Sequence, residues 1–418
     1  MIVRRTSKKL YRRLRRNIKE LPWFKPGTHI PPVLIFFPPF QSQLEFLDTY
    51  YKSSYFLPNQ FASQVHIPIA FDADINLADP KSWPIPDYFY QPQSLNGNLN
   101  IIAERQLKRS YPNMIFKADY VLCWDRNSLL GSRWMNLLDK KFLDIDRYEN
   151  PWDGWTWAQI PLLSQIDINK QREIAQQSFS EFLDSLPVYD KSYIFGTGPS
   201  LDSAIDYDFS DGYRVVCNTI VKNKALMEHI NPHFIVASDA IHHFDNNKHA
   251  YQFRLDLEKY LKKEDVYFLT SERMFPILNY HHPEIGKKTI PLRHDIPGIN
   301  LNLREQLSYT ILHNILNSIL LPVGSSLADK IYCLGFDGRA PNDELFWINS
   351  DANSYSDLKP AIMASHPGFY ELIDFDDYAK QQSKNAERIM TVGEALGKKY
   401  YCLNKTYIPA FRKRQLHI

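Results

Sequence analysis

Cysteine and glycine are both scarce in this chain of 418 residues, which contains 4 Cys and 15 Gly. The cysteines lie far apart in the sequence and form no Cys-x-x-Cys pair, which argues against a zinc site or a redox dithiol. We expect buried thiols without disulfides, as is typical of a reducing compartment. These cysteines are Cys123, Cys217, Cys333 and Cys402.

Acidic residues are absent from the first 19 residues, which carry nine Lys or Arg with apolar residues interleaved at roughly helical spacing. No apolar run follows that suits a signal peptide or a membrane span, because Pro22 and a proline-rich stretch at 26–39 intervene. A basic amphipathic segment fits an anionic membrane surface, and a solvated terminal helix is the alternative. A nucleic-acid partner is not expected, because no basic stripe continues this segment elsewhere. The sequence thus predicts a cytoplasmic protein, peripheral at the inner face of the membrane.

Length and composition predict two globular domains. The chain is too long for one ordinary core, and its 44% hydrophobic and 23% charged residues are values of folded proteins. We predict a basic segment at 1–25, an N-terminal domain at 26–189 and a C-terminal domain at 190–418. A tryptophan cluster at 152–157 lies near that boundary, where a sugar-stacking wall and a packed hinge are both compatible with it.

Short apolar runs separated by longer helical stretches predict an α/β fold with two Rossmann-like domains, each a parallel sheet flanked by helices. In the N-terminal half the runs lie at 33–37, 65–71 and 120–124. In the C-terminal half they lie at 192–195, 213–217, 234–237 and 330–336.

Each run in the C-terminal half ends in residues that can bind a ligand. The first leads into a glycine-rich loop, the second into Asn218, the third into Ser238 and Asp239, and the fourth into Asp337. Parallel sheets bind ligands beyond the carboxyl ends of their strands, so we expect these residues to form one site. Helix capping is the alternative for Asn218 and Asp239.

The glycine-rich loop has the sequence Gly196-Thr197-Gly198-Pro199-Ser200. Successive backbone N–H groups in such a loop, followed by a helix start, suit a phosphate. The loop lacks both the Lys-Ser/Thr pair of a P-loop and the third glycine of a dinucleotide fingerprint, so an ordinary tight turn is the alternative.

These motifs, together with Leu334-Gly335-Phe336-Asp337, His366 and Tyr400-Tyr401-Cys402-Leu403, resemble the CMP-sialic-acid sialyltransferases of glycosyltransferase family 42. The chain is also similar to their relatives, the lipopolysaccharide Kdo transferases and flagellin-glycosylation accessory proteins. The resemblance covers about residues 190–405. It implies that the loop holds the phosphate of the CMP donor, that Asn218 contacts the donor, and that His366 acts on the acceptor or phosphate.

Two features look more like the retaining β-Kdo transferases of glycosyltransferase family 99: the additional N-terminal half and the acid at Asp239. That resemblance implies a GT-B-like arrangement, with the acceptor bound by the N-terminal half and Asp239 as the nucleophile at the anomeric carbon. The expected reaction transfers a CMP-activated ulosonic acid, Kdo rather than sialic acid, to a bacterial surface polysaccharide or lipopolysaccharide. The membrane in question is then the inner membrane.

Further residues are secondary candidates for this site. Arg293 or Arg304 would pair with the donor carboxylate, since a guanidinium binds such a group bidentately, although a surface role is the alternative for each. Asn314 and Asn317 are expected on one face of a helix over 312–321. Ser238 and Asp337 are expected to contact the donor.

No cofactor or divalent metal is expected, because a CMP donor has no diphosphate for a metal to bridge. The pair Asp72 and Asp74 resembles the metal ligands of other sugar-nucleotide enzymes, but we expect acceptor binding or loop capping instead.

Three other functions stay open. One is inverting sialyl transfer with His366 as the base. Another is diphosphate transfer, because the loop also resembles pterin pyrophosphokinases, whose magnesium would need Asp202, Asp206 and Asp208. The third is a catalytically silent scaffold.

Overall fold

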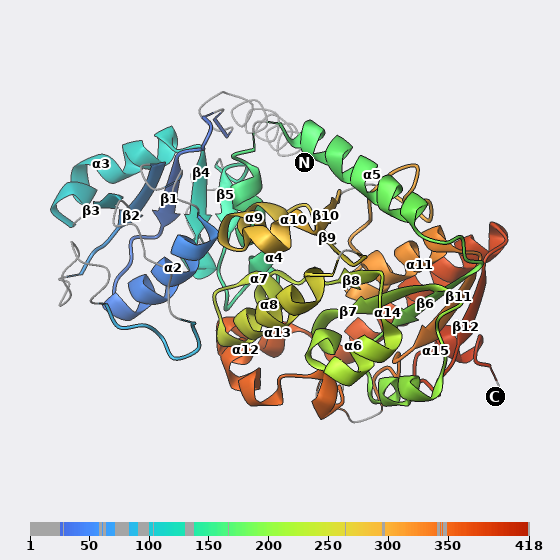
Figure 1. Ribbon diagram of the computed structural model, residues 1–418. Coiled ribbons are helices and arrows are strands. Elements are labelled where there is room, and N and C mark those ends of the chain that lie inside the picture. The colour runs from blue at the N-terminus through green and yellow to red at the C-terminus, as the bar shows by residue number, and fades with distance from the viewer. Residues whose placement is uncertain are drawn as a thin grey trace, which may run out of the picture. The chain divides into compact units, whose positions relative to one another are not determined.

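The computed structural model comprises two compact units, each built on a parallel sheet (Figure 1). The first contains residues 1–166 and 363–372, and the second contains residues 167–362 and 373–418. The predicted α/β fold with two Rossmann-like domains is therefore confirmed. The structure describes residues 26–416 apart from positions 28, 58–60, 62–63, 72–82, 91–99, 103, 130–137, 166, 264, 295–296, 341–342, 344 and 346–348. The basic segment at 1–25 and the pair Asp72 and Asp74 lie outside the described residues.

The first sheet has five parallel strands in the order β3-β2-β1-β4-β5. Its strands are β1 (Leu34–Phe37), β2 (Val65–Pro68), β3 (Asn100–Ile102), β4 (Tyr120–Cys123) and β5 (Phe142–Asp144). Its helices are α2 (Gln43–Phe56), α3 (Glu104–Lys117), α4 (Asp153–Leu162) and α13 (Pro367–Leu372), with α12 (Lys359–Ser365) leading into the last of these. Helix α2 begins at a capping box, in which Ser42 and Glu45 each accept a hydrogen bond from the other's backbone N–H.

The second sheet has seven parallel strands in the order β10-β9-β8-β7-β6-β11-β12. Its strands are β6 (Lys191–Phe195), β7 (Tyr213–Cys217), β8 (Phe234–Val236), β9 (Tyr267–Ser271), β10 (Thr289–Leu292), β11 (Lys330–Leu334) and β12 (Lys399–Cys402). The chain runs outward from β6 to β10 and then returns to the other side of β6. That reversal makes the carboxyl end of β6 the topological switch point, where sheets of this kind bind ligands.

Helices and one π-helical turn connect the strands of the second sheet. They are α5 (Ile168–Ser185), α6 (Lys224–Ile230), α7 (Ala240–Phe244), α8 (Lys248–Leu261), α9 (Phe275–His281), α10 (Pro283–Lys287), a π-helix at Leu316–Leu320, α11 (Leu321–Leu327), α14 (Phe375–Ala395) and α15 (Pro409–Arg412). The inner strands are buried on both faces, as the fully covered neighbours Val215 and Val216 show. Burial on both faces explains why these strands appear in the sequence as unbroken apolar runs.

The boundary between the units differs from the predicted one at 189/190. Helix α5 belongs to the second unit, because its Phe179 and Phe182 pack their rings against Phe234 of β8, at centroid distances of 5.7 and 5.2 Å. Segment 363–372 belongs to the first unit, where the Gly368 N–H donates to the Arg147 carbonyl at 2.8 Å. His366 is thereby moved out of the domain to which the sequence assigned it.

Two local expectations are resolved by packing. All four cysteines are buried and reduced, as predicted. Within the tryptophan cluster, Trp157 is 1% exposed and stacks on Phe56 of α2, with ring centroids 5.8 Å apart, so this residue is part of the core. Trp152 packs edge-on against Phe369, which joins α4 to segment 363–372.

Candidate functional site

In the second sheet, β6, β7, β8 and β11 end within one residue of one another in register, and β9 and β10 continue two residues farther. The register pairs Phe195 of β6 with Leu334 of β11 and Val216 of β7, and it pairs Val236 of β8 with Leu269 of β9. Because the strands are parallel, the residues that follow them lie at one carboxyl edge. The predicted site residues that the structure brings to this edge are Gly196, Thr197, Gly198, Pro199, Ser200, Asn218, Ser238, Asp239 and Asp337.

The glycine-rich loop after β6 is bonded to the loop after β11. The Gly196 N–H donates to the Leu334 carbonyl at 2.8 Å, and the Gly198 N–H donates to the Gly335 carbonyl at 2.9 Å. The Ser200 N–H donates to the carboxylate of Asp337, which lies in the loop after β11. The prediction that successive N–H groups face a phosphate is therefore wrong for these three. Glycine is required at position 196 because the two loops approach each other closely there. A Cβ atom at Gly196 would lie 2.5 Å from the Gly335 oxygen.

The carboxylate that the loop binds is Asp337. Its Oδ2 accepts from the Ser200 hydroxyl at 2.7 Å, and its Oδ1 accepts from the Ser200 N–H at 3.2 Å. Burial raises the pKa of Asp337 against the opposing effect of Ser200, and the charge of Asp202 raises it further. A Cβ atom on Gly198 would collide with this carboxylate. The switch point thus presents an acid, which suits hydroxyl or amino groups of a ligand better than a bare phosphate.

Asn218, directly after β7, has the features of a ligand-binding residue. Its backbone is left-handed, with φ of +50°, a conformation that non-glycine residues seldom adopt. Its side-chain Oδ1 is buried and has no hydrogen-bond partner among the described residues. Next to it, the Thr219 hydroxyl donates to the Asn353 carbonyl, which fastens segment 350–354 beside this strand end. Strain together with an unsatisfied acceptor favours a binding role for Asn218.

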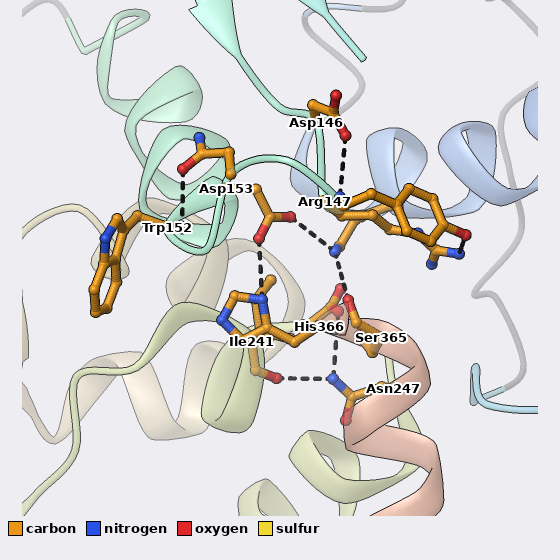
Figure 2. Close-up of polar contacts among 12 residues, drawn as sticks. Asp146, Arg147, Trp152, Asp153, Ile241, Asn247, Ser365 and His366 are labelled. Atoms are coloured by element: carbon orange, nitrogen blue, oxygen red, sulfur yellow. Dashed lines mark hydrogen bonds and ion pairs between the residues drawn. The ribbon is translucent and has the colours of Figure 1, made fainter. Parts of the chain in front are cut away.

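Asp239, after β8, is the N-cap of α7. Its Oδ1 accepts from the Ile241 N–H at 3.0 Å and from the His242 N–H at 2.8 Å, so the capping interpretation is confirmed. The same oxygen lies 2.9 Å from Nδ1 of the His242 ring. The Asp239 side chain is 35% exposed, while Ser238 before it is buried. Farther along α7, the Ile241 carbonyl accepts from Nδ2 of Asn247, the N-cap of α8 (Figure 2).

Three residues near Asp239 were not found from the sequence: His242, His313 and Tyr378. The Tyr378 hydroxyl donates to the carbonyl of His313, which has a left-handed backbone with φ of +69°. Burial and the charge of Asp239 both raise the pKa of Tyr378. Only His242 left a signal in the sequence, three residues after an acid that begins a helix.

His366 lies in the first unit, in a buried ionic cluster. Its Nδ1 is 3.1 Å from Asp153 Oδ1, and Lys52 Nζ is 3.2 Å from Asp153 Oδ2 (Figure 2). Lys52 also donates to the Ser365 carbonyl at 3.1 Å. The imidazole is 3% exposed and stacks on Phe369. Such an environment suits a packing role, so His366 is no longer a candidate base.

The predicted arginines differ in their surroundings. Arg304 is partly exposed and its guanidinium is 2.8 Å from Asp184, in a surface ion pair. Arg293 is exposed in the bridge that follows β10. Neither has a protein environment that would fix it for carboxylate binding.

The predicted helix over 312–321 begins later than expected. Asn314 precedes the π-helix and accepts from the Asn317 N–H at 3.0 Å, while Asn317 donates to the Gln382 carbonyl at 2.9 Å. The two asparagines therefore do not face a ligand together. Periodicity cannot reveal a π-helical turn, which shifts every later side chain around the helix axis.

The acids that a magnesium-dependent diphosphate transfer would need are separated. Asp202 accepts from Asn353 at 3.0 Å, Asp208 accepts from the Ser210 N–H at 2.8 Å, and Asp206 is exposed. In the part of the chain that the structure describes, no three His, Cys, Asp or Glu side chains are grouped as a metal site requires.

No family model, curated protein or solved structure matches the chain. Among the helices described, none combines the length and apolar character that crossing a membrane requires.

Proposed function

We propose that this protein is a glycosyltransferase that uses a CMP-activated ulosonic acid as donor, with the donor at the carboxyl edge of the second sheet. The observation that carries the proposal is Asn218, a left-handed residue with a buried unsatisfied oxygen beside the switch point. Kdo is favoured over sialic acid by Asp239 and by the additional N-terminal half. The acceptor is a bacterial surface polysaccharide or lipopolysaccharide, and the basic segment at 1–25 tethers the enzyme to the inner membrane.

Hydrogen-bond acceptors at the switch point support a nucleoside as the ligand. A cytidine offers an amino group and two ribose hydroxyls, all of them donors, and Asn218 and Asp337 supply acceptors. The donor needs no metal in this proposal, because its single phosphate carries no diphosphate charge to bridge.

Asp239 is the proposed nucleophile. One carboxylate oxygen attacks the anomeric carbon as the bond to the CMP phosphate breaks and CMP leaves. The acceptor hydroxyl then displaces the carboxylate and gives its proton to solvent. The helix cap supports this role by fixing Oδ1 through two backbone N–H groups, which orients the carboxylate before the reaction.

The contact between Asp239 and His242 favours one alternative route. If Asp239 stays a carboxylate, the His242 Nδ1–H donates to it and Nε2 carries the lone pair. In an inverting reaction Nε2 would then accept the proton of the acceptor hydroxyl as that oxygen attacks the anomeric carbon and CMP leaves. His242 replaces His366 as the base of this alternative.

The first experiment is a thermal-shift titration of the full chain with CMP, CTP and ATP. We expect stabilisation by the cytidine nucleotides and none by ATP. A response to ATP alone would favour diphosphate transfer, and no response to any nucleotide would contradict the transferase proposal.

The second experiment separates the two routes. Intact-protein mass spectrometry with donor and no acceptor should reveal a sugar-sized adduct on the peptide that contains Asp239. Turnover to the inverted anomer without any adduct would establish the His242 route instead.

A further inference from the structure

A relay of charged side chains lies at the carboxyl ends of β9 and β10. Arg172 of α5 binds Glu272 bidentately, with Nε to Oε2 at 2.7 Å and Nη2 to Oε1 at 2.8 Å. Glu272 Oε1 lies 3.1 Å from Nδ1 of His294, and Nε2 of that ring lies 2.5 Å from Nε of Arg273. Glu272 is 1% exposed and His294 is 5% exposed, so the middle of the relay is shielded from water.

The hydrogen bonds fix the protonation of every member. Burial alone would raise the pKa of Glu272, but His294 and Arg172 lower it to about 2, so the carboxylate is charged at neutral pH. A guanidinium can only donate, so Nε2 of His294 is the acceptor for Arg273 and the ring proton resides on Nδ1, facing Glu272. Nε of Arg273 is thus held by the imidazole, and its guanidinium carries a positive charge at the partly exposed end of the relay.

Arg273 lies at the same edge as the candidate site. It follows β9 in a turn in which its N–H donates to the Ser271 hydroxyl at 3.3 Å, and its side chain is partly exposed. Val236, the last residue of β8, pairs with Leu269, and β9 continues for two more residues to Ser271, so the turn that holds Arg273 follows the strand next to the one that leads into Ser238 and Asp239. Adjacent strands are about 4.8 Å apart, so Arg273 belongs to the strand end next to that of β8.

We infer that Arg273 is the residue that recognises the carboxylate of the donor sugar, an inference that rests on the proposed function. A fixed guanidinium suits this task, because its planar edge pairs with a carboxylate bidentately and little side-chain freedom remains to be lost on binding. His294 and Glu272 are positioning residues in this scheme. Arg293 and Arg304 have no comparable support, which is why the role passes from them to Arg273.

The test compares Arg273→Met with Arg293→Met, a matched control that removes an exposed arginine beyond the neighbouring strand. Affinities for CMP and for the CMP-linked ulosonic acid are measured by calorimetry. We expect Arg273→Met to weaken binding of the sugar nucleotide at least tenfold and to leave CMP binding unchanged, while Arg293→Met changes neither. An unchanged affinity for the sugar nucleotide, or an equal loss for CMP, would overturn the inference.

Two further measurements keep the outcome interpretable. If Arg273→Met does not fold, as circular dichroism would reveal, His294→Gln is used, because it loosens the arginine without deleting it. That variant should weaken binding of the sugar nucleotide severalfold and leave CMP binding unchanged. Equal effects on both affinities would overturn the inference. If the unmodified protein binds neither compound, the proposed function itself fails, a result distinct from any failure confined to Arg273.

Discussion

Oδ1 of Asp239 lies 2.9 Å from Nδ1 of His242 and also accepts the two N–H groups that begin α7. One carboxylate oxygen therefore caps a helix and orients an imidazole at the edge where the donor is proposed to bind. Capping and chemistry are separable experimentally, because asparagine caps a helix about as well as aspartate but carries no charge.

Asp239→Asn should keep the stability of the second unit and lose several orders of magnitude in turnover, whereas Asp239→Ala should also lose about 1 kcal/mol of stability with the cap. The matched control is Asp167→Ala, which removes the N-cap of α5 instead of that of α7. Turnover of Asp239→Asn near that of the unmodified protein would mean that the residue is only a cap.

Replacing Asn218 by glycine should abolish its ligand contact without a cost in stability. Glycine tolerates the left-handed backbone, and the change removes a buried oxygen that has no partner among the described residues. We expect CMP affinity to fall at least tenfold in calorimetry while the unfolding midpoint stays level or rises. Asn231→Gly, at the other left-handed asparagine with φ of +47°, should leave CMP affinity unchanged.

Gly198→Val should damage the fold as well as the ligand site. The added Cβ would collide with the Asp337 carboxylate and would lie 2.8 Å from the Gly335 carbonyl oxygen. Overpacking of this kind costs about 1–3 kcal/mol. A chemical unfolding curve that matches the unmodified protein would contradict this packing role.

Acid should destabilise the second unit well above the range in which carboxylates titrate. Burial lowers the pKa of His233 and His249 to about 4, and that of His243 to about 3. These histidines are protonated near pH 6.5 in the unfolded chain but stay neutral in the folded chain. The free energy of unfolding is therefore highest above that pH and decreases below it. Each histidine adds a slope of about 1.4 kcal/mol per pH unit. Urea unfolding between pH 7 and 4.5 should show this loss, and His243→Gln should reduce the slope.

The buried cluster of the first unit predicts a large effect from a single substitution. Burial would raise the pKa of Asp153, but Lys52 and His366 lower it. The carboxylate therefore stabilises the fold fully above its ordinary titration range, and this effect is lost as the pH falls from that range through the lowered pKa. Asp153→Ala leaves Lys52 buried without its counter-charge and should cost about 3–5 kcal/mol. A loss below 1 kcal/mol in chemical unfolding would show that water relieves the charge.

The sequence predicted structure correctly where the residues of one short segment were sufficient evidence. Runs such as 213–217 are buried on both faces and therefore stood out as strands. β3 and β5 have three residues each and are only partly buried, so no apolar run marked them. Helix capping could be named as the alternative role of Asp239 because a position before a helix is a local feature.

Partners far away in the chain could not be inferred in this way. The loop at Gly198 is bonded to Gly335, and His366 is paired with Asp153, in each case across well over a hundred residues. The relay through Glu272 and His294 was equally hidden, because its members come from helix α5 and from the turns after β9 and β10. The composition of the loop at 196–200 predicts that it can bind a ligand, but only the fold reveals that its N–H groups are already bonded to the loop after β11.

The return of residues 363–372 to the first unit has a consequence for dissecting this protein. The chain passes from one unit to the other at 166/167, again at 362/363 and once more at 372/373, so no single cut yields two intact halves. A fragment that begins at residue 190 would lack α5 and would carry Phe369 without Trp152, against which its ring packs. An exchange of either unit between relatives therefore requires three matched crossovers, at 166/167, 362/363 and 372/373, instead of one.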